Sequence, residues 1–234
     1  MPEFLPVELA AGTFRYASYG EHAAPPLVLL HGMPSDSSSW APVAPELAAA
    51  GYRVIAPDQR GHGHSARTAS YSLQEMRDDL HQLAGELGLE TFALAGHSMG
   101  GTVATLFAER YGDRLTGLII VDSPVPDGSG TWETGPRPDG ELPYDWAVMP
   151  AIFDQLRNPD PAWQADLALI AAPTLVIGGG TASPVPQHQL AGMAHSVPNA
   201  RLATIEGAGH AVHRNCAAEF VAVVEPFLRQ IRAS

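Results

Sequence analysis

The chain has 234 residues, of which 45% are hydrophobic and 16% charged, a composition typical of a compact globular protein. Its net charge is −12 and it contains no lysine, which argues against nucleic acid or an anionic membrane as the main partner, because both attract basic surfaces. The single cysteine, Cys216, excludes an internal disulfide and a multi-cysteine metal site. No apolar run reaches the roughly 18 residues that a membrane span needs. The N-terminus lacks the pattern of a secretory signal, so we expect a cytoplasmic protein.

Short runs rich in Val, Ile and Leu alternate with helical patterns along the chain, which predicts an α/β fold with a mostly parallel sheet and helices on both faces. Before these runs, residues 13–19 alternate large and small side chains and predict an antiparallel entry strand. Ser72 and Glu75 form a capping box that begins a predicted helix. The parallel strands are predicted at 27–30, 53–56, 92–95, 117–122, 174–177 and 201–205, with a final helix around Phe220, Val224 and Phe227.

Residues 124–143 interrupt this alternation, because they are rich in proline and glycine and show no periodicity. Short helices are predicted after them, at 144–156 and 163–170. An insertion of roughly 35 to 40 residues between two strands is typical of a lid or binding loop. We therefore expect one domain over residues 1–234 with a small cap at about 124–165. Trp132 and Trp146 either line an apolar substrate entrance or pack the cap onto the core, and the sequence favours neither role.

The segment Gly96-His97-Ser98-Met99-Gly100 stands between a predicted strand and a predicted helix at 102–111. A nucleophile on such a turn takes strained backbone angles, so the residues two positions before and after it must lack bulk. Gly96 and Gly100 meet that need. The turn also directs the Ser98 hydroxyl toward a helix N-terminus, where free N–H groups favour developing negative charge. We therefore predict that Ser98 is a nucleophile; the alternative is a glycine-rich turn with an incidental serine.

Four further segments, in the same order along the chain, resemble landmarks of the α/β-hydrolase family. His31-Gly32-Met33-Pro34 resembles the oxyanion loop of that family, and residues 58–65 resemble its D-x-R-G-x-G-x-S segment. Residues 173–177 and 207–210 resemble its last two landmarks. The resemblance covers nearly the whole chain and implies an α/β-hydrolase fold. It also implies that the backbone N–H groups of Met33 and Met99 form an oxyanion hole, with the two methionine side chains as its apolar floor.

The base that activates Ser98 must be chosen among ten histidines. His210 lies in a loop of small residues after the last predicted strand, where the family places its catalytic histidine. His213 is the nearest rival, and we expect a solvent-facing or helix-start role for it. His31 and His97 flank the oxyanion region and are expected to brace loops.

The acid is where the sequence departs from the family pattern. The usual position follows the strand at 174–177, but Ala182 aligns with it, and no Asp or Glu occurs between Leu169 and Ala203. Asp122 ends the strand at 117–122, from which some members of the family supply their acid. We therefore predict that Asp122 orients His210, with a dyad assisted by water or Glu206 as the alternative. Asp58 is expected to hold its own loop by hydrogen bonds.

These residues predict hydrolysis of a small ester-like molecule, a carboxylic ester, lactone or thioester, through an acyl-enzyme on Ser98. In this family the dehalogenase and epoxide-hydrolase branches need an aspartate nucleophile, so a serine disfavours them. Carbon–carbon bond hydrolysis, a perhydrolase side activity, an acyltransferase or cyclase reaction, and a ligand-binding or biosynthetic protein without turnover all stay open. The sequence indicates no cofactor and no metal, because the histidines lack ligand spacing with carboxylates and no dinucleotide fingerprint occurs. It leaves the oligomeric state undetermined.

Overall fold

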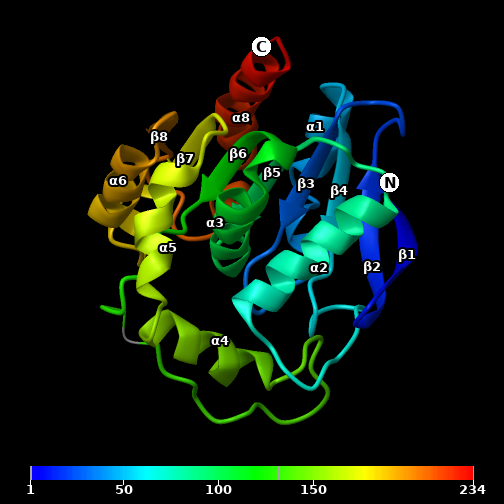
Figure 1. The fold of residues 1–234 in the computed structure, drawn as a ribbon, viewed down its shortest axis with the longest axis vertical. Coiled ribbons are helices and arrows are strands. Elements are labelled where there is room, and N and C mark those ends of the chain that lie inside the picture. Colours follow the sequence, from blue (N-terminus) through cyan, green and yellow to red (C-terminus); the bar gives the residue numbers. More distant parts are fainter. Residues whose placement is uncertain (1, 131, 234) are drawn as a thin grey trace.

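The computed structural model of the chain describes residues 2–130 and 132–233. An eight-stranded sheet runs through them in the order β1-β2-β4-β3-β5-β6-β7-β8 (Figure 1). β1 and β2 form an antiparallel hairpin, β2 pairs antiparallel with β4, and every pair from β4 to β8 is parallel. The strands are β1 (Glu3–Leu9), β2 (Gly12–Tyr19), β3 (Pro26–Leu30), β4 (Arg53–Pro57), β5 (Phe92–His97), β6 (Leu115–Val121), β7 (Thr174–Gly178) and β8 (Ala200–Thr204).

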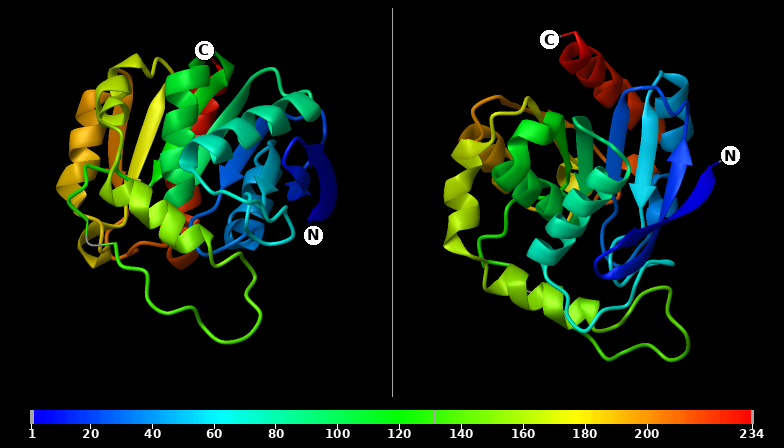
Figure 2. Two further views of the ribbon diagram at one scale, coloured as in Figure 1. Left: turned by 60° about the horizontal axis from the view of Figure 1, so that its bottom comes forward. Right: turned by 45° about the vertical axis from the view of Figure 1, so that its right-hand side comes forward.

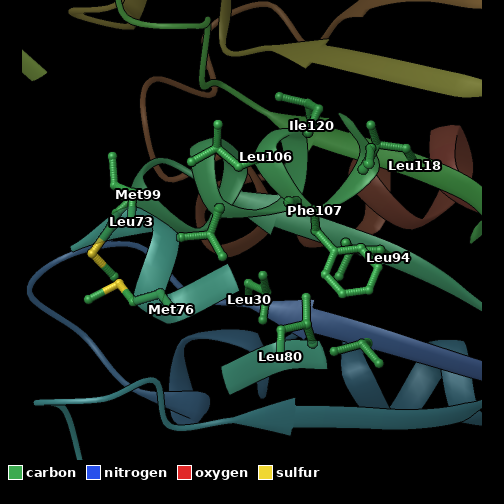
Figure 3. Packing of buried hydrophobic residues seen from close by; sticks show 14 of the residues in the cluster. Leu30, Leu73, Met76, Leu80, Leu94, Met99, Leu106, Phe107, Leu118 and Ile120 are labelled. Atoms are coloured by element: carbon green, nitrogen blue, oxygen red, sulfur yellow. The ribbon is translucent and has the colours of Figure 1, made fainter. Parts of the chain in front are cut away.

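Helices cover both faces of this sheet, α2 and α3 on one side and α1 and α8 on the other (Figure 1). Alternate residues of the central strands enter the two cores: Leu30 and Leu94 pack under α2 and α3 (Figure 3), whereas Leu29 packs on the opposite face. Burial on both faces explains why these strands are continuous apolar runs. The helices are α1 (Ala44–Ala49), α2 (Leu73–Glu86), α3 (Met99–Tyr111), α4 (Val148–Arg157), α5 (Pro161–Asp166), α6 (Gln187–Ser196), α7 (Val212–Asn215) and α8 (Ala217–Arg232).

The structure confirms the predicted α/β fold, and each predicted strand lies within two residues of an observed one. The capping box is also present, since the Ser72 hydroxyl accepts a hydrogen bond from the Glu75 N–H. The edge strand β1 was not predicted. Its side chains are exposed or only half-buried and Pro6 interrupts it, so it carries no apolar run. α1 and α6 were also not predicted.

The cap lies beside the carboxyl edge of the sheet, with α4 and the preceding loop at the bottom of Figure 1 and projecting below the strands in Figure 2. The end of its loop, at residues 143–145, is fixed to the turn after β4. The Gly63 N–H donates to the Pro143 carbonyl (2.8 Å) and the Asp145 N–H to the Gly61 carbonyl (2.7 Å). The Tyr71 hydroxyl also donates to the Asp145 carboxylate (2.7 Å). Because 143–145 is held extended here, the helix predicted at 144–156 begins only at Val148.

The start of the cap loop is attached to α6, because the Gln189 side-chain amide donates to the Asp127 carboxylate (3.0 Å). Between the two attachments, residues 127–130 and 135–141 are exposed, as expected for a segment rich in proline and glycine. Within residues 2–130 and 132–233, no helix is both long enough and apolar enough to cross a membrane.

Candidate active site

The turn between β5 and α3 carries the predicted nucleophile, Ser98. Its backbone has φ 52° and ψ −123°, a region that side chains rarely adopt. Glycines flank it because side chains do not fit: a Cβ at Gly96 would collide with the Gly100 carbonyl, and one at Gly100 with the Leu30 carbonyl. The Ser98 hydroxyl is half-buried and has no hydrogen-bond partner within the described part of the chain. Contacts between nucleophile and base are often long or poorly aligned before substrate binds.

The structure joins the other two predicted catalytic residues directly. His210 Nδ1 lies 2.8 Å from Asp122 Oδ2, with the carboxylate fully buried and the His210 side chain 37% exposed. The His210 loop is held on the loop after β7, because the Gly209 N–H donates to the Gly179 carbonyl (2.9 Å). A buried acid that contacts an accessible imidazole can fix its tautomer and stabilise its protonated form.

Three donors that were not predicted also bind Asp122. The Gly179 N–H donates to Oδ1 (3.0 Å), the Ser183 hydroxyl to Oδ2 (2.5 Å) and the Gln187 side-chain amide to Oδ1 (3.5 Å). Burial alone would raise the pKa of Asp122, but the hydrogen bonds from His210, Ser183 and Gly179 together hold that pKa below its usual range. The carboxylate is therefore ionised at neutral pH. The one sequence signal for this contact was the position of Ser183, whose hydroxyl directly follows Ala182, the residue that aligns with the usual acid of the family.

His97, the residue before Ser98, contacts the His210 loop. A carbonyl only accepts, so His97 Nε2–H donates to the His210 carbonyl at 2.9 Å, and the two rings lie 4.7 Å apart. Burial lowers the pKa of His97 to about 3, which keeps the ring neutral. The expectation that His97 braces loops is confirmed.

His213 is the second residue of α7, so of the two roles expected for it the structure supports the helix-start role and not the solvent-facing one. Its ring is fully buried, 4.0 Å from the Trp40 ring and 4.7 Å from the His97 ring. Burial lowers the pKa of His213 to about 2. The surrounding aromatic side chains leave no path for this ring to reach substrate, whereas His210 remains accessible.

The loop after β3, which carries the predicted oxyanion donor Met33, lies against Ser98. Gly32 abuts the nucleophile so closely that a Cβ there would lie 2.9 Å from the Ser98 Cβ. His31 braces this loop: Nε2 accepts from the Gln59 N–H (3.0 Å), so Nδ1 carries the proton donated to the Gly32 carbonyl (2.9 Å). Met33, the next residue, is half-buried.

Met99 is the first residue of α3, so its N–H has no partner inside the helix. Its side chain, however, is wrongly predicted as the floor of the oxyanion hole. The side chain is 4% exposed and packs with Leu73 and Met76 in the core between α2 and α3 (Figure 3).

The remaining predicted residues lie outside this cluster. Asp58 is fully buried and accepts from the Ser37 and His64 N–H groups and from Arg15, which confirms that it holds its loop. In the cap, the Trp132 ring packs 5.7 Å from Phe153, and the Trp146 ring lies 6.3 Å from Tyr144. Both tryptophans therefore contact other aromatic rings of the cap.

The family model for the alpha/beta hydrolase fold matches residues 25–165, more than half of the chain. The chain belongs to the α/β-hydrolase fold family. Epoxide hydrolase B of Mycobacterium tuberculosis is 34% identical over 150 residues, which are 62% of this chain and 40% of the relative. A putative non-heme chloroperoxidase of Synechocystis is 34% identical over 142 residues, 60% of this chain and 50% of the relative. The chain thus spans half or less of the length of these curated relatives.

Among solved structures, the fold of this α/β hydrolase is similar to that of an N-acyl homoserine lactonase, with a TM-score of 0.85 and 23% identity, covering 99% of this chain and 98% of the other. It is also similar to an esterase from Thermogutta terrifontis, with a TM-score of 0.80 and 24% identity over 98% and 99% of the two chains. At these identities the likeness establishes the shared architecture.

Proposed function

We propose that this α/β hydrolase is a serine hydrolase that cleaves a carboxylic ester, lactone or thioester of a small molecule. The observation that carries the proposal is the strained, glycine-flanked Ser98 turn beside the hydrogen-bonded pair of His210 and Asp122. A nucleophile, an accessible imidazole and a buried carboxylate are the parts that acyl transfer requires.

In the proposed reaction, Ser98 Oγ attacks the carbonyl carbon while His210 Nε2 takes the hydroxyl proton. Asp122 holds Nδ1–H and stabilises the imidazolium. The N–H groups of Met33 and Met99 bind the oxyanion. His210 then protonates the leaving oxygen or sulfur, and an acyl-enzyme forms. The alcohol or thiol of an acyclic substrate departs, whereas the alcohol of an opened lactone stays attached to the acyl group. Water attacks that ester as His210 removes its proton, and the acid product leaves as Ser98 regains its hydrogen.

The nucleophile separates this proposal from epoxide hydrolysis, although epoxide hydrolases are among the relatives. That branch needs an aspartate to form its covalent intermediate, and this chain has Ser98 at the turn. The fold shared with a lactonase and an esterase supports ester chemistry on this frame. A ligand-binding protein without turnover is disfavoured because the one feature behind it, the missing acid at Ala182, is compensated by Asp122.

A fluorophosphonate probe and a panel of esters, lactones and thioesters test the proposal on wild type, Ser98→Ala and Asp122→Asn. We expect labelling of wild type, none of Ser98→Ala, and a fall in kcat of about 10³- to 10⁴-fold in Asp122→Asn. An unlabelled wild type that hydrolyses no substrate would overturn the enzyme proposal. Full activity of Asp122→Asn would reject the assignment of Asp122 as the acid and leave the enzyme proposal standing.

A further inference from the structure

The proposed acid, Asp122, follows one strand and is contacted by a residue that follows the neighbouring strand. Asp122 follows β6, whereas Ser183 lies in the loop after β7, one residue beyond Ala182. Asp122 Oδ2 accepts both the His210 Nδ1–H (2.8 Å) and the Ser183 hydroxyl (2.5 Å). The loop that lacks a carboxylate therefore still reaches the oxygen that orients the base.

The direction of the Ser183 hydrogen bond follows from its neighbours. An ionised carboxylate only accepts, so the hydroxyl must donate to it. The Val185 N–H donates to Ser183 Oγ (3.0 Å), which occupies an acceptor site of that oxygen and leaves its proton for Asp122. Both partners are thus fixed, as expected of a side chain that sets the orientation of another.

We propose that Ser183 is a positioning residue for Asp122, and that position 183 is a second place from which a carboxylate can orient His210. This inference rests on the proposed serine-hydrolase function. The geometry supports both parts, because Ser183 Oγ and His210 Nδ1 contact the same carboxylate oxygen. An aspartate at 183 extends one bond further than serine, into the space that this oxygen occupies.

Loss of the Ser183 hydroxyl has a defined consequence for the acid. With one donor fewer on Oδ2, the Asp122 carboxylate is held less firmly against His210 Nδ1, so His210 is oriented less well.

The first test compares Ser183→Ala with Ser183→Thr, which keeps the hydroxyl. We expect the alanine variant to lose about 5- to 10-fold in kcat with KM nearly unchanged. The threonine variant should restore kcat. A Ser183→Ala variant with the kcat of wild type would overturn the positioning role.

The second test moves the acid. In Asp122→Gly, which empties the space of the carboxylate, the added substitution Ser183→Asp should raise kcat at least about tenfold, whereas the matched control Ala182→Asp should not, because Ala182 is exposed. Rescue by Ala182→Asp in place of Ser183→Asp would overturn the assignment of position 183, as would rescue by neither.

A measurement that needs no turnover distinguishes a failure of this inference from a failure of the proposed function. The downfield proton resonance of the His210–Asp122 hydrogen bond can be measured in Ser98→Ala, with and without Ser183→Ala. A changed resonance supports the positioning role even if no hydrolysed substrate is found, and an unchanged one rejects it even if the enzyme is active.

Discussion

Ser98 and Asp122, which follow neighbouring strands of the sheet, both have a positive φ angle. Their φ angles are 52° and 48°, and among the described residues other than glycine no others have a positive φ. The Ser98 N–H donates to the carbonyl of Val121, so the two turns lie side by side at one point of the carboxyl edge. A residue held in such a region costs on the order of 1–3 kcal/mol, and that strain persists where the surrounding structure enforces it.

This strain can be measured at Ser98. Ser98→Gly removes the Cβ that disfavours these backbone angles, so we expect the inactive variant to be more stable than wild type by about 1 kcal/mol. Thermal unfolding should show a Tm about 2 to 4 °C higher. Ser98→Ala is the matched control, since it removes the hydroxyl and keeps the Cβ. Equal Tm values for the two variants would contradict stored strain at this turn.

The hydrogen bond from His97 to the His210 carbonyl predicts a role for the residue before the nucleophile. His97→Leu leaves that carbonyl without its donor, so the His210 loop should loosen and kcat should fall about tenfold. His97→Gln places an amide N–H at similar reach and should recover most of the loss. Steady-state kinetics on an ester that wild type hydrolyses would check both. A glutamine variant as impaired as the leucine variant would show that the ring itself is required.

Glu109 on α3 predicts a loss of stability at alkaline pH. Burial, with the carboxylate of Asp166 nearby, raises the pKa of Glu109 to about 8, and Oε1 has no hydrogen-bond partner in the described chain. The folded state therefore holds this proton more tightly than the unfolded state does. Its stabilising contribution is complete below the ordinary pKa of about 4.5 and is lost as pH rises through about 8.

We expect Glu109→Gln to be more stable than wild type by about 1 to 2 kcal/mol near pH 9 and nearly equal to it near pH 5. Chemical denaturation at the two pH values measures this difference. The same substitution at an exposed glutamate, Glu90→Gln, serves as the matched control. A constant offset between Glu109→Gln and wild type at all pH values would rule out the titration.

The attachment of the cap predicts the effect of Tyr71→Phe. This change removes the hydrogen bond to Asp145, so the segment before α4 should open more often, with a loss of about 1 kcal/mol of local stability. Hydrogen exchange should become faster at residues 143–148, and strands β5 and β6 should be unaffected. Unchanged exchange in that segment would show that the backbone bonds to Gly61 and Gly63 suffice.

Local sequence patterns predicted the parts of the site that a local turn creates. Ser98 stands in a motif whose two flanking glycines are required, because a side chain at either position would collide with the backbone. His210 follows a strand in a loop of small residues. Asp122 was reached by elimination, since nothing in its own neighbourhood distinguishes it from a carboxylate at any strand end. Its left-handed backbone became visible only in the structure.

The contacts that connect distant segments were not predicted. Ser183 reaches Asp122 across 61 positions of the sequence, and their meeting depends on the register of β6 and β7, which apolar runs do not fix. The side chain of Met99 was misplaced for a related reason. A helix N-terminus orients the main chain predictably, whereas the direction of a side chain there depends on the packing of α2.

The cap also makes this fold convenient for protein engineering. Its loop is fixed at Asp127 and at Pro143, so the exposed residues between can be exchanged for segments of other lengths while the catalytic turns stay in place. Doubling the length of such a loop costs only about 0.6 kcal/mol in closure entropy. A library of grafted loops at this place would test whether this segment affects the substrate range of the proposed serine hydrolase. Natural divergence has the same freedom, since the segment can vary without any change to Ser98, His210 or Asp122.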